Sequence, residues 1–386
     1  MPVKVHWGSP AHWAIRLLWV AATIALIMYI PTRAQPSTIS DMTTALELAT
    51  VAMALNLVMG FGGLISLGHS AYFGLGAYTM AVLVDHYGWT QGWTLYIAAV
   101  VGFVVGCLTS LPALRLKGVY LALTSIALAV LFPQLVKWRK LEWLTDGARG
   151  IDDLQYDDIP EWPILGELDG RRGRAVWMYW LAVIIAVVSY LICRGVVKSR
   201  VGRSLVAIRD NETAAAVMGV NRARTQTIVY GLSAAMTAVA GALFGIGLNG
   251  VNPDLRYFTL IGSITFVVIM VIGGGATLWG PIVGAFVYVL VENRTREWGA
   301  ESSGIIGVLF GWLNSSPATF ILAVALLVLM FVAPFGIVGL LKRLAAKALV
   351  VVPRPAGTRS NVPPVEEGLD PTIDEPFLPA SPEETP

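Results

Sequence analysis

Charge is scarce in this sequence. Only 13% of its 386 residues are charged and 56% are hydrophobic, whereas about 25% of a soluble domain is charged. This composition excludes an ordinary soluble fold and predicts a polytopic membrane protein in contact with the lipid bilayer. The basic residues form no stripe with interleaved aromatic side chains, so nucleic acid is not expected as a partner.

Catalytic and nucleotide-binding motifs are missing as well. The sequence has no G-x-x-x-x-G-K-[ST], so the chain is not expected to hydrolyse ATP itself. It also lacks H-E-x-x-H, G-x-S-x-G and any cysteine and histidine cluster with metal-ligand spacing, so no enzymatic or metal site is predicted. Both cysteines, Cys107 and Cys193, lie in apolar runs and are expected to pack as small hydrophobic side chains.

Apolar runs are abundant. A helix needs about 20 apolar residues to cross a bilayer, and about ten segments of the chain come close to this length, the third, eighth and ninth of them short. The predicted fold is therefore an all-α polytopic membrane protein. The segments are residues 13–31, 42–60, 70–85, 93–112, 118–137, 175–194, 226–248, 259–272, 278–292 and 317–338.

Loop charge predicts how these segments are oriented. The basic loop 195–225 should be cytoplasmic. Counting spans from it places the N-terminus (1–12) and the C-terminal tail (341–386) on the same side, around a transmembrane domain at 13–340. The acidic loop 141–174 then lies outside. The tail is rich in proline and acidic residues and is predicted to be disordered from about residue 352.

Two glycine-rich stretches, residues 56–78 and 272–284, interrupt the apolar runs. Glycine in a helix interior costs about 1 kcal/mol relative to alanine, so both stretches predict broken or re-entrant helices. They could line or shape a transport pathway, or they could allow close packing of helices. The candidate pathway residues are Gly62, Gly63, Ser66, Gly68, His69, Gly273, Gly274 and Thr277.

Three ionisable residues near the spans have open roles. His69 follows the first glycine-rich stretch, and it could act on a substrate or proton or be hydrogen-bonded to unwound backbone. Glu47 and Glu292 are expected near the outer interface. A proton relay needs ionisable groups at depth, and the sequence supplies few of them.

The polar stretch 199–220 lies between two apolar runs. It begins with basic residues and continues as a predicted amphipathic helix that Gly219 could end. It could be a helix lying on the membrane surface, or a docking helix that transmits force from a soluble partner to the flanking spans.

Three stretches together resemble the LivM-type permease subunits of ABC importers for branched-chain amino acids. Residues 56–78 are similar to the family pattern N-L-x-x-G-x-x-G-x-x-S-L-G-H-x-A-F-F-G-x-G-A-Y. Residues 202–220 resemble G-R-x-x-x-A-I-R-D-x-E-x-A-A-x-x-x-G-[IV], and residues 270–285 resemble the glycine-rich motif that ends in G-P-x-x-G-A. The resemblance covers about residues 40 to 340. Asp146 departs from it, since it stands where the family pattern has glycine.

The resemblance implies a division of labour in a bacterial inner or plasma membrane. This chain and a second, LivH-like permease would form the pathway, two cytosolic ABC ATPases would bind ATP, and an extracytoplasmic substrate-binding protein would deliver a hydrophobic amino acid. The chain itself would need no cofactor. The polar stretch would be the coupling helix, with its apolar face seated on the ATPase. The implied coupling residues are Gly202, Arg203, Ala207, Arg209, Asp210, Glu212, Ala215 and Gly219.

Other functions remain open at this stage. A permease for urea or short amides would have a closely similar sequence. A secondary transporter would differ by membrane-buried carboxylates or a repeated ion site. A membrane scaffold would have no use for paired glycine-rich stretches.

Overall fold

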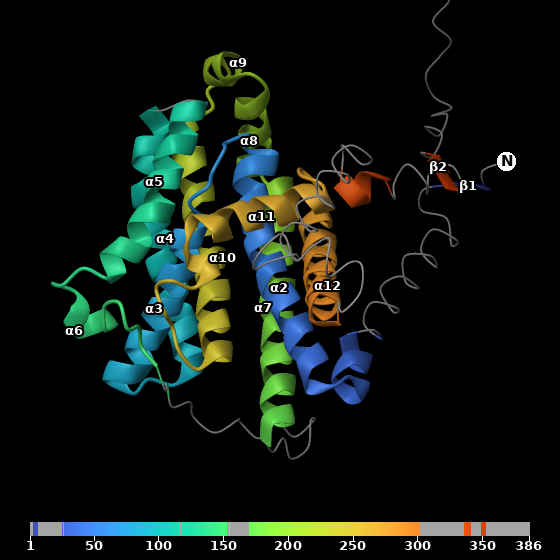
Figure 1. Cartoon of the computed structure of the whole chain (residues 1–386). Coiled ribbons are helices and arrows are strands. Elements are labelled where there is room, and N and C mark those ends of the chain that lie inside the picture. The colour runs from blue at the N-terminus through green and yellow to red at the C-terminus, as the bar shows by residue number, and fades with distance from the viewer. Residues whose placement is uncertain are drawn as a thin grey trace, which may run out of the picture.

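The computed structural model describes residues 3–6, 25, 27–115, 118–152, 154, 170–301, 336–340 and 349–352. Long helices form a bundle, and two of the several short helices lie at one end of it (Figure 1). The long helices are α2 (Pro36–Asn56), α3 (His69–Tyr87), α4 (Gln91–Arg115), α5 (Val119–Val136), α7 (Gly170–Lys198), α10 (Arg222–Leu248), α11 (Leu260–Gly273) and α12 (Gly280–Glu301). The short ones are η1 (Leu57–Phe61), α6 (Glu142–Thr145), α8 (Arg200–Asp210), α9 (Glu212–Val217) and η2 (Arg256–Phe258).

The apolar helices confirm a multi-pass membrane protein. Among the described residues, four helices are long and apolar enough to cross a bilayer, and two further apolar helices are shorter. The predicted segments from 42–60 to 278–292 each fall on a helix. Segments 13–31 and 317–338 lie mostly outside the described residues, so the number ten stays a prediction. Helix α7 extends beyond both predicted bounds, 175 and 194.

In the described part of the chain, the otherwise all-helical structure contains one short sheet that the sequence did not predict. Strand β1 (Val3–His6) pairs in parallel with β2 (Leu349–Val352) in a two-stranded sheet. Backbone pairing between such distant residues has no local sequence signal, because each strand is only four residues long. The part of the tail predicted to be disordered, beyond residue 352, lies outside the described residues.

Helix α10 packs in the middle of the bundle against α3 and α4. Small residues let the backbones approach closely, as in other membrane helix pairs. A Cβ atom on Gly76 would lie 1.8 Å from the carbonyl oxygen of Ala238, and one on Gly241 would lie 1.9 Å from that of Phe73. Gly76, in the first glycine-rich stretch, and Gly241, in α10, therefore allow these helices to pack closely. Close packing is one of the two interpretations given above for that stretch.

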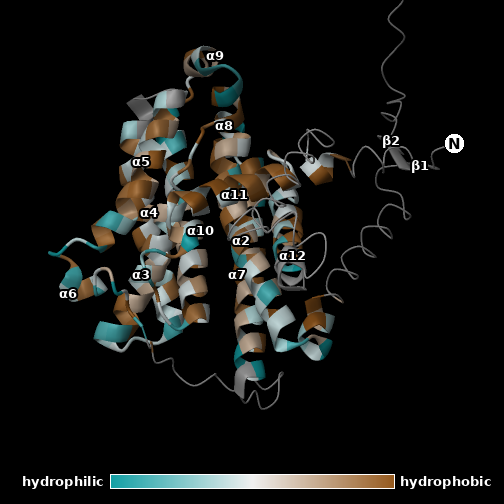
Figure 2. Ribbon diagram, viewed as in Figure 1, coloured by the Kyte–Doolittle hydropathy of each residue, from teal (hydrophilic) through white to brown (hydrophobic). Residues whose placement is uncertain are grey.

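The outward faces of α4 and α5 are apolar, as the hydropathy colouring indicates (Figure 2). Such surfaces suit contact with lipid or with another membrane subunit. Their exposed side chains include Val100, Phe103, Val104, Leu108 and Leu111 on α4 and Leu123, Val130, Leu131 and Leu135 on α5.

Replacing Gly76 with alanine is expected to destabilise the protein. The new Cβ would overlap the carbonyl oxygen of Ala238, which belongs to helix backbone and cannot move away cheaply. Overpacking of this kind costs about 1–3 kcal/mol, so the thermal unfolding temperature in detergent should fall. Gly92→Ala is the matched control, because a Cβ there has nothing within 4 Å. Equal unfolding temperatures for the two variants would contradict this account of the α3–α10 contact.

Candidate coupling site and broken spans

The first glycine-rich stretch breaks the apolar helix, as predicted. Helix α2 widens at its end into the π-helical turn η1, and residues 62–68 are non-helical until α3 begins at His69. Gly63 adopts a φ of 65°, a left-handed conformation that favours glycine. Within the break, Gly62 N–H donates to the carbonyl of Leu57 at 3.1 Å and Leu64 N–H to that of Val58 at 3.1 Å. The break is therefore an ordered turn.

The second glycine-rich stretch separates α11 from α12. Gly274 and Ala276 have positive φ angles of 114° and 56°, so the chain reverses sharply between the two helices. The Thr277 hydroxyl donates to the Gly274 carbonyl at 2.8 Å and accepts from Gly280 N–H at 3.0 Å. Thr277 thus joins the end of one helix to the start of the next.

Asn56 connects the two breaks. Its side-chain oxygen accepts from Ala276 N–H at 2.8 Å, and its side-chain nitrogen donates to the Thr277 carbonyl at 2.8 Å. Asn56 is only 2% exposed. Gly60 lies against the same contact, because a Cβ there would be 2.6 Å from Ala276 N. The two breaks are therefore one connected unit.

Sequence reasoning missed Asn56 as a functional residue. The available signal was a primary amide at the start of a glycine-rich break. An amide carries both a donor and an acceptor, so it can satisfy the N–H and the C=O of unwound backbone that water does not reach.

The polar stretch forms two helices and not the single helix predicted. Ser199 caps α8 by accepting from Val201 N–H at 3.1 Å. Asn211 then turns the chain through an extended conformation (φ −155°, ψ 103°) and caps α9 by accepting from Ala214 N–H at 2.9 Å. Gly219 follows with a φ of 80°, in keeping with its predicted role at the helix end.

Helix α8 packs directly on the first break. Arg209 Nη1 donates to the Gly60 carbonyl at 3.1 Å. A Cβ on Gly63 would lie 2.5 Å from Arg209 Cγ, and a Cβ on Gly62 would lie 3.2 Å from Leu205 Cδ1. The break therefore contacts one charged side chain of α8, Arg209, and one apolar side chain, Leu205.

The apolar face of α8 is turned inward, contrary to the expectation that it would seat on an ATPase. Leu205 is 1% exposed and belongs to a cluster with α2, α7 and α10, and Ile208 is also buried. They bury apolar area against their own chain, and this area is no longer free for a partner. Val217 and Met218, at the end of α9, are 82% exposed.

The implied coupling residues occupy two environments. Gly202 and Ala215 are buried and Glu212 is half-buried, whereas the others face outward. Arg209 pairs with Asp210 at 3.0 Å, and Glu212 pairs with Arg222 at the start of α10. The outward-facing ones are Arg203, Ala207, Arg209, Asp210 and Gly219.

The candidate pathway residues gather around the breaks, and most are buried. Gly62, Ser66, Gly68, His69, Gly273 and Gly274 are buried, Thr277 is half-buried and Gly63 is exposed beneath Arg209.

The bonds of His69 favour the structural interpretation of this residue. Its Nε2 lies 2.8 Å from Ser233 Oγ and its Nδ1 3.2 Å from Ser66 Oγ. Because the Ser233 hydroxyl already donates to the Ala54 carbonyl at 2.7 Å, it accepts from Nε2–H, and Nδ1 accepts from Ser66. His69 is thus a neutral, fully bonded link between α2, α3 and α10.

Two carboxylates near the ends of predicted spans are buried by the protein itself. Glu292 is 8% exposed and accepts from Arg256 Nη1 at 2.9 Å, while Arg256 Nη2 donates to the Tyr288 hydroxyl at 2.6 Å. Burial lowers the pKa of Arg256, but Tyr288 and Glu292 raise it more, so the residue keeps its charge. Glu47 is 4% exposed.

Comparison with known proteins classifies this architecture. The profile of the family described as "Branched-chain amino acid transport system / permease component" matches residues 37–333. The protein is therefore a multi-pass membrane permease of the ABC transporter type, a transport subunit and not an enzyme. It belongs to the branched-chain amino acid transport permease family.

Individual relatives agree with this assignment. The chain is 26% identical over 309 residues to the high-affinity branched-chain amino acid transport permease LivM of Escherichia coli, covering 76% of this chain and 71% of that one. It is 28% identical over 251 residues to a probable LivM of Methanocaldococcus jannaschii, covering 63% and 67%. The LivH permease of E. coli is 23% identical over 267 residues, covering 65% and 82%.

Replacing Asn56 with leucine is expected to loosen the connection between the breaks. The change leaves Ala276 N–H and the Thr277 carbonyl without their partner, and each buried unsatisfied group costs about 1–3 kcal/mol. The thermal unfolding temperature and the transport rate should both fall. Thr50→Val is the matched control on α2, because the buried Thr50 hydroxyl bonds only the carbonyl one turn before it, at 3.0 Å. Equal losses for both variants would show that the contact between the breaks has no special role.

Proposed function

We propose that this chain is one of two permease subunits of an ABC importer for branched-chain amino acids, driven by ATP hydrolysis on separate cytosolic subunits. Family membership and the branched-chain amino acid transport of its LivM and LivH relatives support the substrate class. The observation that carries the mechanism is the contact of Arg209 on α8 with the first break, which Asn56 joins to the second.

The exposed end of α9 is the contact point for an ATPase. Val217 and Met218 are apolar and 82% exposed at one end of the bundle (Figure 1). Arg203 and Asp210 add charges that can fix the register of docking through charge-assisted bonds. The ATPase then binds the tip of α9, while the inner face of α8 stays packed against its own chain.

Movement of α8 passes to the breaks. A shift of α8 displaces the Gly60 carbonyl and the chain at Gly63 through Arg209. Asn56 transmits the shift to Ala276 and Thr277. Closure of the ATPase subunits therefore rearranges the unwound backbone of both halves together, which is how such switches amplify a small displacement.

The remaining parts follow the family arrangement. A second, LivH-like permease completes the pathway, and an extracytoplasmic binding protein delivers the substrate on the side opposite α9. The chain ends and α8 are cytoplasmic, and the complex resides in a bacterial cell membrane. The glycine-rich breaks, with the candidate residues described above, shape the pathway.

Two variants separate docking from transmission. Met218→Glu places a charge on the exposed tip without altering the core, so the ATPases should no longer co-purify and uptake should fall about tenfold or more. Arg209→Ala leaves the tip intact but removes the bond to Gly60, so the ATPases should still bind and hydrolyse ATP while uptake falls.

The exposed Thr213→Ala on α9 is the control, and it should retain uptake and binding. Normal ATP-driven uptake by both Met218→Glu and Arg209→Ala would refute the coupling role of this region.

The substrate is tested by uptake into vesicles that contain the complete complex. Leucine, isoleucine and valine should accumulate only with ATP, and urea should not. ATP-driven uptake of urea without uptake of the amino acids would instead assign the chain to a urea or short-amide importer.

A further inference from the structure

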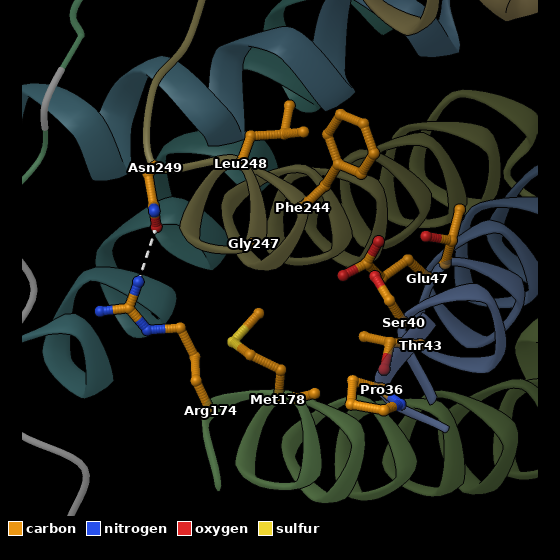
Figure 3. A pocket seen from close by; sticks show the side chains of 12 residues that line it. Pro36, Ser40, Thr43, Glu47, Arg174, Met178, Phe244, Gly247, Leu248 and Asn249 are labelled. Carbon is orange, nitrogen blue, oxygen red and sulfur yellow. Dashed lines mark hydrogen bonds between the residues drawn. The ribbon is translucent and has the colours of Figure 1, made fainter. Parts of the chain in front are cut away.

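A cavity of about 390 Å³ lies between α2, α7 and α10, away from the breaks (Figure 3). Its volume falls within the roughly 300–1,000 Å³ of small-molecule sites. It is formed near the start of α2 and α7 and the end of α10, at the end of the bundle opposite α9. In the proposed orientation it faces the side from which substrate arrives.

The Glu47 side chain points into this cavity (Figure 3). No residue that the structure describes forms a hydrogen bond or ion pair with its carboxylate, although the residue is only 4% exposed. By contrast, Glu292, the other buried carboxylate noted above, is held by Arg256. An ionised carboxylate is costly to bury without a cation, so the cavity suits a ligand that carries an ammonium group.

The opposite wall of the cavity carries positive charge. Arg174 on α7 lies across the cavity from Glu47 (Figure 3), where its Nη1 donates to Asn249 Oδ1 at 3.2 Å. A guanidinium group at this position attracts a carboxylate. The two charged walls therefore match the two charges of a free α-amino acid.

Apolar side chains complete the cavity between the charged walls. Met178, Phe244 and Leu248 line it, and Phe244 is fixed by ring contacts with Phe73 and Tyr257 at 5.3 and 5.4 Å. Such a surface accepts an aliphatic side chain, while the hydroxyl-bearing Ser40, Thr43 and Thr44 line the cavity on the same helix as Glu47.

We propose that this cavity binds the zwitterionic amino acid within this subunit, with Glu47 holding the ammonium group, Arg174 attracting the carboxylate, and Met178, Phe244 and Leu248 enclosing the aliphatic side chain. The proposal rests on the proposed function and adds a substrate site to it, separate from the broken spans.

The test measures protection of a thiol in the cavity. Ser40, which lines the cavity on α2, is replaced with cysteine in a complex whose chain has Cys107→Ser and Cys193→Ala. Leucine should slow modification of this thiol by a methanethiosulfonate reagent about tenfold. The analogues 3-methylbutylamine and 4-methylpentanoate, which lack the carboxylate and the ammonium respectively, should protect far less.

Two controls define the site. Ser37→Cys on the same helix lies outside the cavity lining, and leucine should not protect it. Adding Glu47→Gln to Ser40→Cys should abolish protection by leucine, measured as the ratio of the modification rates with and without leucine for that variant. Absence of protection, equal protection by either analogue, or protection that survives Glu47→Gln would overturn the proposal.

Uptake by the unmodified complex separates this proposal from the proposed function. ATP-driven leucine uptake without thiol protection would refute the cavity site and leave the importer function standing. Thiol protection by leucine without uptake of any branched-chain amino acid would refute the importer function and support the site.

Discussion

Unwound backbone inside an apolar bundle must find its hydrogen-bond partners within the protein, because neither lipid nor apolar side chains supply them. The two broken spans meet this constraint through one side chain. The Asn56 amide bonds the N–H of Ala276 and the carbonyl of Thr277, which lie about 220 residues further along the chain. The Asn56 side chain thereby connects the position of one break to that of the other.

The attachment of α8 follows from the same geometry. The first break presents free backbone and two glycines without side chains, so Arg209 and Leu205 can approach it closely. Burial of Leu205 and Ile208 attaches the inner face of α8 to its own chain, whereas Val217 and Met218 at the tip of α9 stay exposed. In the proposed function, the buried face of α8 and the exposed end of α9 allow this segment to transmit movement from a partner to its own chain.

The buried carboxylates Glu292 and Glu47 are not part of the contact between the two breaks. The ion pair of Glu292 and Arg256 is satisfied internally, whereas the Glu47 carboxylate faces a cavity. Buried carboxylates would favour a secondary transporter when considered alone. Family membership overrules that interpretation, and in the proposed cavity site Glu47 is instead the partner of the ammonium group of an amino acid.

Local features of the sequence determined the class of protein: the apolar runs predicted the spans, glycine predicted the breaks, and the motif at 202–220 indicated the family. These signals are readable because each depends on neighbouring residues. The bond partners of Asn56, the inward turn of Leu205, the neutral bonding of His69 and the pairing of Glu292 with Arg256 each join distant segments. Only the tertiary structure decided them, because a contact between distant residues depends on how the helices pack and leaves no periodic pattern in the chain.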